Sequence, residues 1–254
     1  MINKINYISF IILQIIFGFL LADFITAIFH WFEDTYLDYD CKLPFFSDIA
    51  KHNEMHHYFP RSIIAYSIYE NIDTTIPFAI ILVVIIYVFF RKQLFMYPFF
   101  FGSFILFSVF SNVFHKFSHM RDCELPIVVK YLQRIGIICS HKEHSIHHSK
   151  NNNQKYCVMS GYLNYILDNL GFWRGLEWLV KKITGKSPKR KGKYDDYKEI
   201  HNYMHENNKK ECPKIPTKED IDILIKKLDH FIKTNPDFAI KYLESFSQRH
   251  DTNF

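Results

Sequence analysis

The sequence predicts an all-α integral membrane protein with about three to four transmembrane or interfacial helices and a small helical tail. The first observation is three long apolar runs with little or no charge, Tyr7–Phe29, Thr74–Phe90 and Leu94–Phe114. A helix that crosses the roughly 30 Å hydrocarbon core of a bilayer needs about 20 such residues. The other two observations are histidines that gather at the ends of these runs and a basic excess confined to the C-terminal part.

The first run favours a membrane anchor over a cleaved signal peptide. Tyr7–Phe29 is 23 residues long and no A-x-A cleavage site follows it, whereas the apolar core of a signal peptide has about 7–15 residues. The average composition, 48% hydrophobic and 22% charged, hides this pattern because the polar C-terminal part dilutes the apolar runs. We therefore expect a membrane-embedded domain over residues 1–185.

The remainder of the chain divides into a basic and polar linker, 186–216, and a helical tail, 217–254. Residues 181–254 hold 17 Lys and Arg against 12 Asp and Glu, which accounts for the whole net charge of +5. Thr217 and Asp220 form a helix-capping pattern, and apolar residues at helical spacing follow it. We interpret the tail as solvated, with docking of an acidic partner or of anionic lipid as the alternative, and expect no nucleic-acid partner.

Histidines gather where the apolar runs end. Ten of the 14 are His30, His52, His56, His57, His115, His119, His141, His144, His147 and His148. Three crossings of the membrane would bring all ten to one face and leave only the short link Arg91-Lys92-Gln93 exposed on the other. Nearly all Lys and Arg lie on the histidine side, so the positive-inside rule predicts that this face is cytoplasmic.

The histidine spacings suit metal ions. Residues four apart, such as His115 and His119 or His52 and His56, lie on one face of a helix, and neutral imidazole binds Zn, Cu, Fe and Ni. Eight or more imidazoles are too many for one tetrahedral ion, so two metals fit better, and a two-iron centre that activates dioxygen is the chemistry that most needs such a set. Each cluster alone could instead be a packed side chain, a helix surface at the headgroups or a solvated loop.

Three carboxylates are candidates for a supporting role. Asp34, four residues after His30, could accept the second ring N–H of a ligand histidine, or could be a helix cap. Asp23 interrupts the first apolar run, where a carboxylate is rare enough to indicate function, although packing against a helix is the alternative. Glu177 lies on a later amphipathic segment and could support the ligands or lie at the interface.

Five segments resemble a known family. They are ADFITAIFHWFEDTY (22–36), EMHHYFP (54–60), NVFHKFSH (112–119), HSIHHSKNNNQKYCVMSG (144–161) and NYILDNLGFWRGLE (164–177). In order and spacing they are similar to the lipid desaturase family of the plasmanylethanolamine desaturase (Kua) type, which also includes a plastid phosphatidylglycerol desaturase. The resemblance covers about two thirds of the chain, and the tail lies outside it.

The resemblance implies a membrane enzyme that uses two iron ions and O2 to desaturate an alkyl or acyl chain of a phospholipid. The implied catalytic and metal-binding residues are His30, His56, His57, His115, His119, His144, His147 and His148. His52 and His141 fall outside the motifs and are secondary. In the plasmanylethanolamine case the product is a vinyl ether, the step that forms a plasmalogen.

Several expectations follow for partners and location. The chain has no flavin, nicotinamide or haem motif, so electrons must come from a donor such as cytochrome b5 or a ferredoxin. We expect a multi-pass protein of the endoplasmic reticulum membrane. The alternatives are a phosphatidylglycerol or fatty acyl desaturase, a membrane fatty acid hydroxylase, and a non-enzymatic metal-binding, metal-transporting or scaffold protein.

Overall fold

The computed structural model describes residues 4–37, 41, 44–58, 60–149, 153–188, 215–223 and 225–226, and every regular element in them is helical. The elements are α1 (Lys4–Tyr36), α2 (Pro44–Tyr58), a 3-10 helix η1 (Pro60–Ala65), α3 (Ile68–Asp73), α4 (Ile76–Met96), α5 (Pro98–Val109), α6 (Ser111–His119), α7 (Ile127–Arg134), α8 (His141–Ser149), α9 (Tyr162–Asn169) and α10 (Phe172–Thr184). The predicted all-α class is confirmed over this part of the chain.

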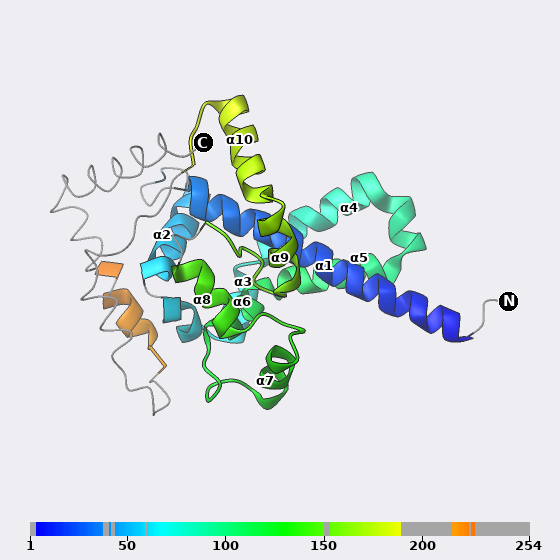
Figure 1. Ribbon diagram of the computed structural model, residues 1–254, viewed down its shortest axis with the longest axis horizontal. Helices are drawn as coiled ribbons and strands as arrows, with labels where there is room; N and C mark the ends of the chain where they lie inside the picture. Colours follow the sequence, from blue (N-terminus) through cyan, green and yellow to red (C-terminus); the bar gives the residue numbers. More distant parts are fainter. Residues whose placement is uncertain are drawn as a thin grey trace.

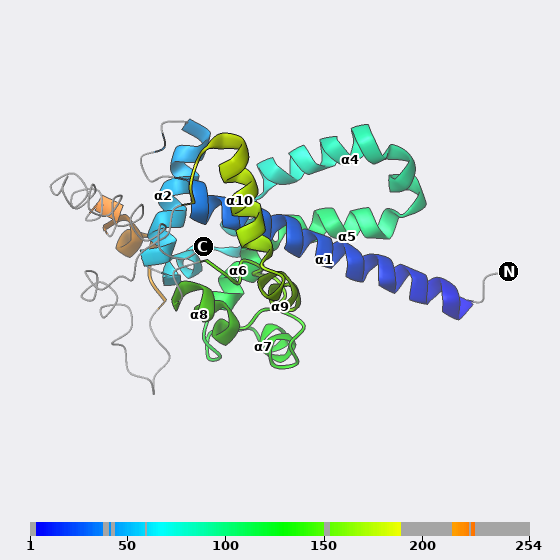
Figure 2. The same ribbon diagram turned by 45° about the horizontal axis from the view of Figure 1, so that its top comes forward.

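Helix α1 runs along the long axis of the molecule and has two different environments. Its N-terminal half lies beside a hairpin made of α4 and α5, whereas α2, α6, α8, α9 and α10 gather around its C-terminal half (Figure 1). The turned view shows the same division, with the hairpin projecting away from the other helices (Figure 2). Large apolar side chains are exposed on the N-terminal half of α1 and on α4, and buried polar side chains concentrate at the other end. This distribution is typical of a membrane protein, because lipid rather than water covers the apolar part.

Two helices are long and apolar enough to cross a membrane, Asn6–Tyr36 and Ile76–Met96. The third predicted run, Leu94–Phe114, is not one straight helix. It is divided between α5 and α6, which meet at a 50° bend and would form a third span if the bent pair crosses as a unit. The last four residues of this run, 111–114, therefore belong to the helix that carries His115 and His119.

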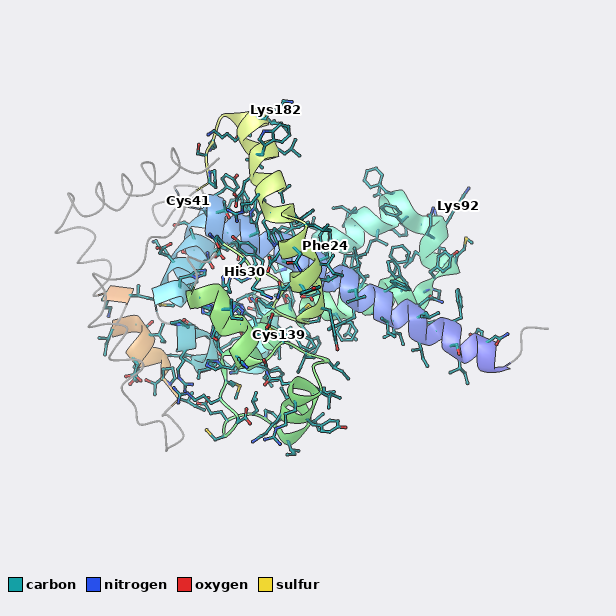
Figure 3. The ribbon with its side chains drawn as sticks, viewed as in Figure 1. Phe24, His30, Cys41, Lys92, Cys139 and Lys182 are labelled. Atoms are coloured by element: carbon teal, nitrogen blue, oxygen red, sulfur yellow. The ribbon has the colours of Figure 1, made fainter. Side chains whose placement is uncertain are left out.

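The predicted link Arg91-Lys92-Gln93 is helical, because α4 continues through it to Met96 with non-helical dihedrals at Phe90. The reversal comes at Tyr97, directly before the proline that begins α5. Figure 3 labels Lys92 near the tip of the hairpin and His30 among the helices at the other end. The link thus lies at the tip of the hairpin, away from His30, and the predicted count of three crossings stays a prediction.

Helices α1 and α5 approach closely at Gly18. A Cβ atom at this position would lie 2.0 Å from Ser103 Oγ and 2.5 Å from the carbonyl oxygen of Phe100. Around the contact, Ala22, Phe101 and Phe104 form a buried apolar cluster. Only glycine permits this backbone approach, so the α1–α5 contact depends on Gly18.

We expect Gly18→Ala to destabilise the protein, because the backbone of α5 cannot yield as a flexible side chain could. Overpacking of this kind costs about 1–3 kcal/mol, which thermal unfolding in detergent would detect as a lower midpoint. Gly102 on α5 provides the matched control, since a Cβ there meets nothing within 4 Å. An equal effect of Gly18→Ala and Gly102→Ala would show that the close approach is unimportant.

A cluster of polar contacts fastens η1 to the end of α6 and the turn after it. The guanidinium of Arg61 donates to both carboxylate oxygens of Glu124, at 3.1 and 2.6 Å. The Lys116 ammonium donates to the carbonyl oxygens of Ile64, at 3.1 Å, and Tyr66. These bonds fix the segment between α2 and α3 against the helix that carries His115.

The start of the tail shows the predicted capping contacts. Thr217 donates from its backbone N–H and its hydroxyl to Asp220, and the Asp220 N–H donates back to the hydroxyl. Most of the predicted linker 186–216 and most of the tail 217–254 lie outside the described residues, so their division stays a prediction.

Candidate metal centre

The eight motif histidines lie together at the C-terminal end of α1, in two adjacent groups. The first group is His56, His115, His119, His144 and His148, and the second is His30, Asp34, His57 and His147. In each group, one nitrogen or oxygen atom from every residue lies within 4.8 Å of the corresponding atoms of the others. The rings of His57 and His148, one from each group, have centroids 5.0 Å apart.

Helical periodicity explains how each group is assembled. His115 and His119 on α6 are four residues apart and point the same way, as do His144 and His148 on α8. Both pairs therefore enter the first group, and the pair His30 and Asp34 on α1 enters the second by the same spacing.

Adjacent histidines enter different groups. Successive helical residues differ by about 100° around the axis, so His56 and His57 on α2 point to the first and second group respectively. His148 and His147 on α8 repeat this division. Helices α2 and α8 thus contribute to both groups, whereas α6 serves only the first and α1 only the second.

Asp34 takes a more central place than the sequence indicates. Its carboxylate lies 2.5 Å from His57 Nε2, 3.1 Å from His147 Nε2 and 3.5 Å from His30 Nε2. Asn53 on α2 donates to its Oδ1 atom at 3.0 Å. Sequence reasoning offered Asp34 as a partner of one histidine, and the structure brings its carboxylate to all three histidines of the second group.

The segment between α8 and α9 orients two of these histidines through its backbone. His30 Nδ1 donates to the carbonyl oxygen of Tyr156 at 3.0 Å, and His147 Nδ1 donates to that of Gln154 at 2.7 Å. Each bond fixes the tautomer and leaves Nε2 with its lone pair directed at the second group. Sequence analysis missed this role, because backbone carbonyls carry no residue-type signal.

Asp23 and Asn164 hold that segment in place. The Asp23 carboxylate accepts from the N–H groups of Met159 and Ser160, both at 3.0 Å, and from the Ser160 hydroxyl at 2.7 Å. Asn164 bonds both the N–H and the carbonyl of Cys157, each at 2.8 Å. The structure therefore places the intramembrane carboxylate Asp23 outside both groups, where it anchors the segment that orients His30.

Burial in the cluster favours the neutral form of several of its imidazoles. Burial, reinforced by neighbouring imidazoles, holds the pKa of His56, His144 and His148 well below the ordinary value. A neutral imidazole has a free lone pair and can act as a metal ligand without first losing a proton.

The donor set fits metal ions. In the first group the Nε2 atoms of His115 and His144 are 2.9 Å apart, and that of His119 is 3.2 Å from that of His115. Nitrogen atoms that bind one ion at about 2.0–2.1 Å stand at about this separation. Both ring nitrogens of His56 and the Asp34 Oδ2 atom are buried without a hydrogen-bond partner among the described residues, which a bound cation would explain. The cluster can therefore hold metal, with imidazole as the dominant ligand.

The two histidines outside the motifs lie outside both groups. His52 is exposed, and its Nδ1 donates to the carbonyl oxygen of Asp48, one turn earlier on α2, at 2.8 Å. His141 begins α8 and its Nδ1 donates to the carbonyl oxygen of Ser118 at 3.2 Å. Their sequence spacing to His56 and His144 is helical, but neither reaches the cluster.

Glu177 on α10 also lies outside both groups. It is buried, and Arg174 Nη1 lies 2.8 Å from its Oε2 atom. Burial raises the pKa of Glu177 to about 7, against the opposing effect of the Arg174 charge. A raised carboxyl pKa means that the folded state prefers the protonated form of Glu177. The protonated carboxyl therefore contributes fully to the stability of the fold below pH 4.5, and this contribution is lost as the pH rises through 7.

We expect Glu177→Gln to become more stable relative to the wild type as the pH rises from 5 to 8. The raised pKa of Glu177 corresponds to a change in the free energy of unfolding of about 3 kcal/mol at most, at 1.36 kcal/mol for each pKa unit. Thermal unfolding across this range measures it, with Asp73→Asn at an exposed carboxylate as the control. A stability difference that does not change with pH would contradict the assignment.

Comparisons with known proteins agree with this geometry. A family model described as a lipid desaturase domain matches residues 19–191. A probable fatty acid desaturase of Acanthamoeba polyphaga mimivirus is 33% identical over 183 residues, which cover 70% of this chain and 86% of that protein. Plasmanylethanolamine desaturase 1 of Mus musculus is 33% identical over 186 residues, which cover 70% and 68%.

A plant relative is similar over a comparable share of the chain. Fatty acid desaturase 4-like 1, chloroplastic, of Arabidopsis thaliana is 30% identical over 172 residues, which cover 67% of this chain and 57% of that protein. No solved structure matches the chain. The residues matched by the family model, 19–191, include all nine members of the two groups.

Proposed function

The chain belongs to the lipid desaturase family, and we propose that it uses O2 to remove two hydrogens from an alkyl or acyl chain of a membrane phospholipid. The observation that carries the proposal is the pair of adjacent groups, whose nine donor residues, eight of them buried and His148 half-buried, lie at the end of a helix long and apolar enough to span a membrane. Neither a single structural metal, which needs about four ligands, nor an exposed metal buffer needs such a set.

The proposed substrate is a plasmanylethanolamine, whose alkyl chain would become a vinyl ether. The similarity to the mouse plasmanylethanolamine desaturase supports this choice, as does a Myxococcus xanthus protein of the same name, 30% identical over 185 residues. Desaturation of an acyl chain is the second candidate. The similarity to proteins named fatty acid desaturases, at 33% and 30% identity, favours it.

Two iron ions are the proposed cofactor, with five histidines holding one and His30, Asp34, His57 and His147 the other. When bound, they would supply the oxidising chemistry that turns a –CH2–CH2– unit, O2, two electrons and two protons into –CH=CH– and two waters. The chain's own residues would hold the two ions and orient the histidine ligands. The carbonyls of Gln154 and Tyr156 direct two imidazoles, and the Asp34 carboxylate balances positive charge in a buried site.

The surroundings decide what reaches the centre. Its buried position at the end of α1 would keep bulk water away, and the exposed apolar side chains on α1 and α4 support a position next to the lipid phase. We propose that the histidine end faces the cytoplasm of an endoplasmic reticulum membrane, which the basic C-terminal part supports through the positive-inside rule. An electron donor such as cytochrome b5 or a ferredoxin would then supply the two electrons from that side.

A lipid mass comparison tests the function. Cells expressing the wild type are compared with cells expressing His147→Ala, with an acid step that releases aldehyde from vinyl ethers. We expect a phospholipid two hydrogens lighter only with the wild type, and release of an aldehyde from it. Both proteins are first quantified in the membrane fraction.

The other outcomes separate the alternatives. A lighter lipid without acid-released aldehyde would indicate an acyl desaturase. A gain of one oxygen would identify a hydroxylase. Identical lipids from both strains, with a matched electron donor co-expressed, would contradict enzymatic activity and favour a scaffold.

A further inference from the structure

A basic pocket lies next to the metal centre without belonging to it. Its volume is about 270 Å³, and its lining includes four cationic side chains, Arg121, Lys130, Arg134 and Lys142, together with Asp122 and His141. It lies between α7, the turn before it and the first residues of α8. His141 is one helical turn before His144, so the pocket opens beside the helix that serves both metal groups.

The charge of this pocket favours an anion. Asp122 is the one carboxylate in the lining and lies 3.4 Å from Lys130 Nζ and 3.3 Å from Arg134 Nη2. Two nearby acids are engaged elsewhere, since Glu124 binds Arg61 and Glu143 lies 2.9 Å from Lys155. Four cations therefore face one carboxylate, and an ammonium and a planar guanidinium both bind phosphate well.

Helix α7 places this pocket at a lipid surface. Ile127, Val128 and Tyr131 on α7 are 78%, 65% and 61% exposed, and the opposite face of the helix packs inward through Val129 and Gln133. A short helix with an outward apolar face flanked by cations is typical of one that lies in the headgroup region of a bilayer. In both views α7 lies at about the same level along the long axis as α9 and the start of α4 (Figure 1, Figure 2).

We propose that this pocket binds the phosphate group of a membrane phospholipid, with the lipid's chains lying against the apolar face of α7. The inference rests on the proposed function for the presence of a phospholipid substrate, but it concerns binding and needs no turnover. Arg121, Lys130, Arg134 and Lys142 hold the phosphate, while Asp122 keeps Lys130 and Arg134 directed at the pocket and limits the affinity.

Binding to the purified full chain in detergent tests the proposal, with native mass spectrometry as the readout. The probes are a phosphatidic acid, a diacylglycerol with the same chains and inorganic phosphate. The variants are Arg134→Gln/Lys142→Gln, which removes two exposed cations, and Asp122→Asn, which removes the carboxylate. The control is Lys181→Gln/Lys182→Gln, which removes the same charge from α10, outside the pocket.

We expect the wild type to prefer phosphatidic acid over diacylglycerol. The Arg134→Gln/Lys142→Gln pair should weaken phosphatidic acid binding by about tenfold or more, since a hydrogen bond to a charged group contributes on the order of a factor of ten. Asp122→Asn should strengthen it, and the control should leave it unchanged. The opposite signs of the two pocket variants cannot come from loss of folding.

Four results would overturn the inference. They are equal binding of phosphatidic acid and diacylglycerol, equal weakening by the control, inorganic phosphate that binds as tightly as the lipid, and pocket variants that change only the dependence of turnover on the electron donor. The third would indicate a site for free phosphate and the fourth a protein-docking surface. If no desaturated product forms but the expected binding pattern holds, the proposed function fails and the pocket stands.

Discussion

Replacing Asp34 with asparagine is expected to lower the metal content of the purified chain from two ions to one and to abolish desaturation. Asp34 is the only carboxylate in either group, and it contacts all three histidines of the second group. Without it, three neutral imidazoles would have to hold a cation in a buried site with no compensating charge. We expect activity to fall by more than about a hundredfold, since even the partners that orient metal ligands cost about 10–100-fold when removed.

Glu33 provides the matched control for this variant. It is the neighbouring carboxylate on α1 but lies outside both groups, so Glu33→Gln should keep two ions. Elemental analysis gives the metal count independently of turnover, and the first group should retain its ion in Asp34→Asn. Two ions in Asp34→Asn, together with wild-type activity, would show that this carboxylate only orients histidines.

The sequence predicts the membership of the cluster because most of that information is local. Helical spacing places His115 with His119 and His144 with His148, and the count of crossings brings those pairs to one end of the molecule. The division into two groups is also encoded locally, because the neighbours His56 and His57 must diverge by about 100°. The sequence therefore predicts two metals, and the divergence of neighbouring histidines assigns each of them to one group.

The rest depends on contacts between distant parts of the chain. The bond from His30 to the carbonyl of Tyr156 joins residues 126 positions apart, and any residue could supply that carbonyl. Asp34 lies at helical spacing from His30, but its contact with His147 exists only when α1 and α8 pack together. The bend between α5 and α6 falls at Phe110, in a stretch with no proline or glycine, so nothing in the residue types predicts it.

A pair of variants on α2 tests whether the position of a histidine, and not only its presence near the cluster, decides whether it binds metal. His52 and His56 are one helical turn apart, so their spacing alone predicts metal binding equally well for both. The structure places His56 among His115, His119 and His148, with ring centroids 4.7, 4.5 and 4.9 Å away. His52 instead bonds the backbone of its own helix and is exposed.

We therefore expect His56→Ala to lose one metal ion and nearly all activity, and His52→Ala to keep both. The loss should exceed about a hundredfold for His56→Ala, because a missing ligand costs at least as much as a missing orienting partner. An exposed substitution at His52 should stay within about 0.5 kcal/mol of wild-type stability. Both are measured by metal analysis and lipid turnover on the same preparations. If the two variants behaved alike, position on the helix face would not decide ligation, and the assignment of the first group would have to be abandoned.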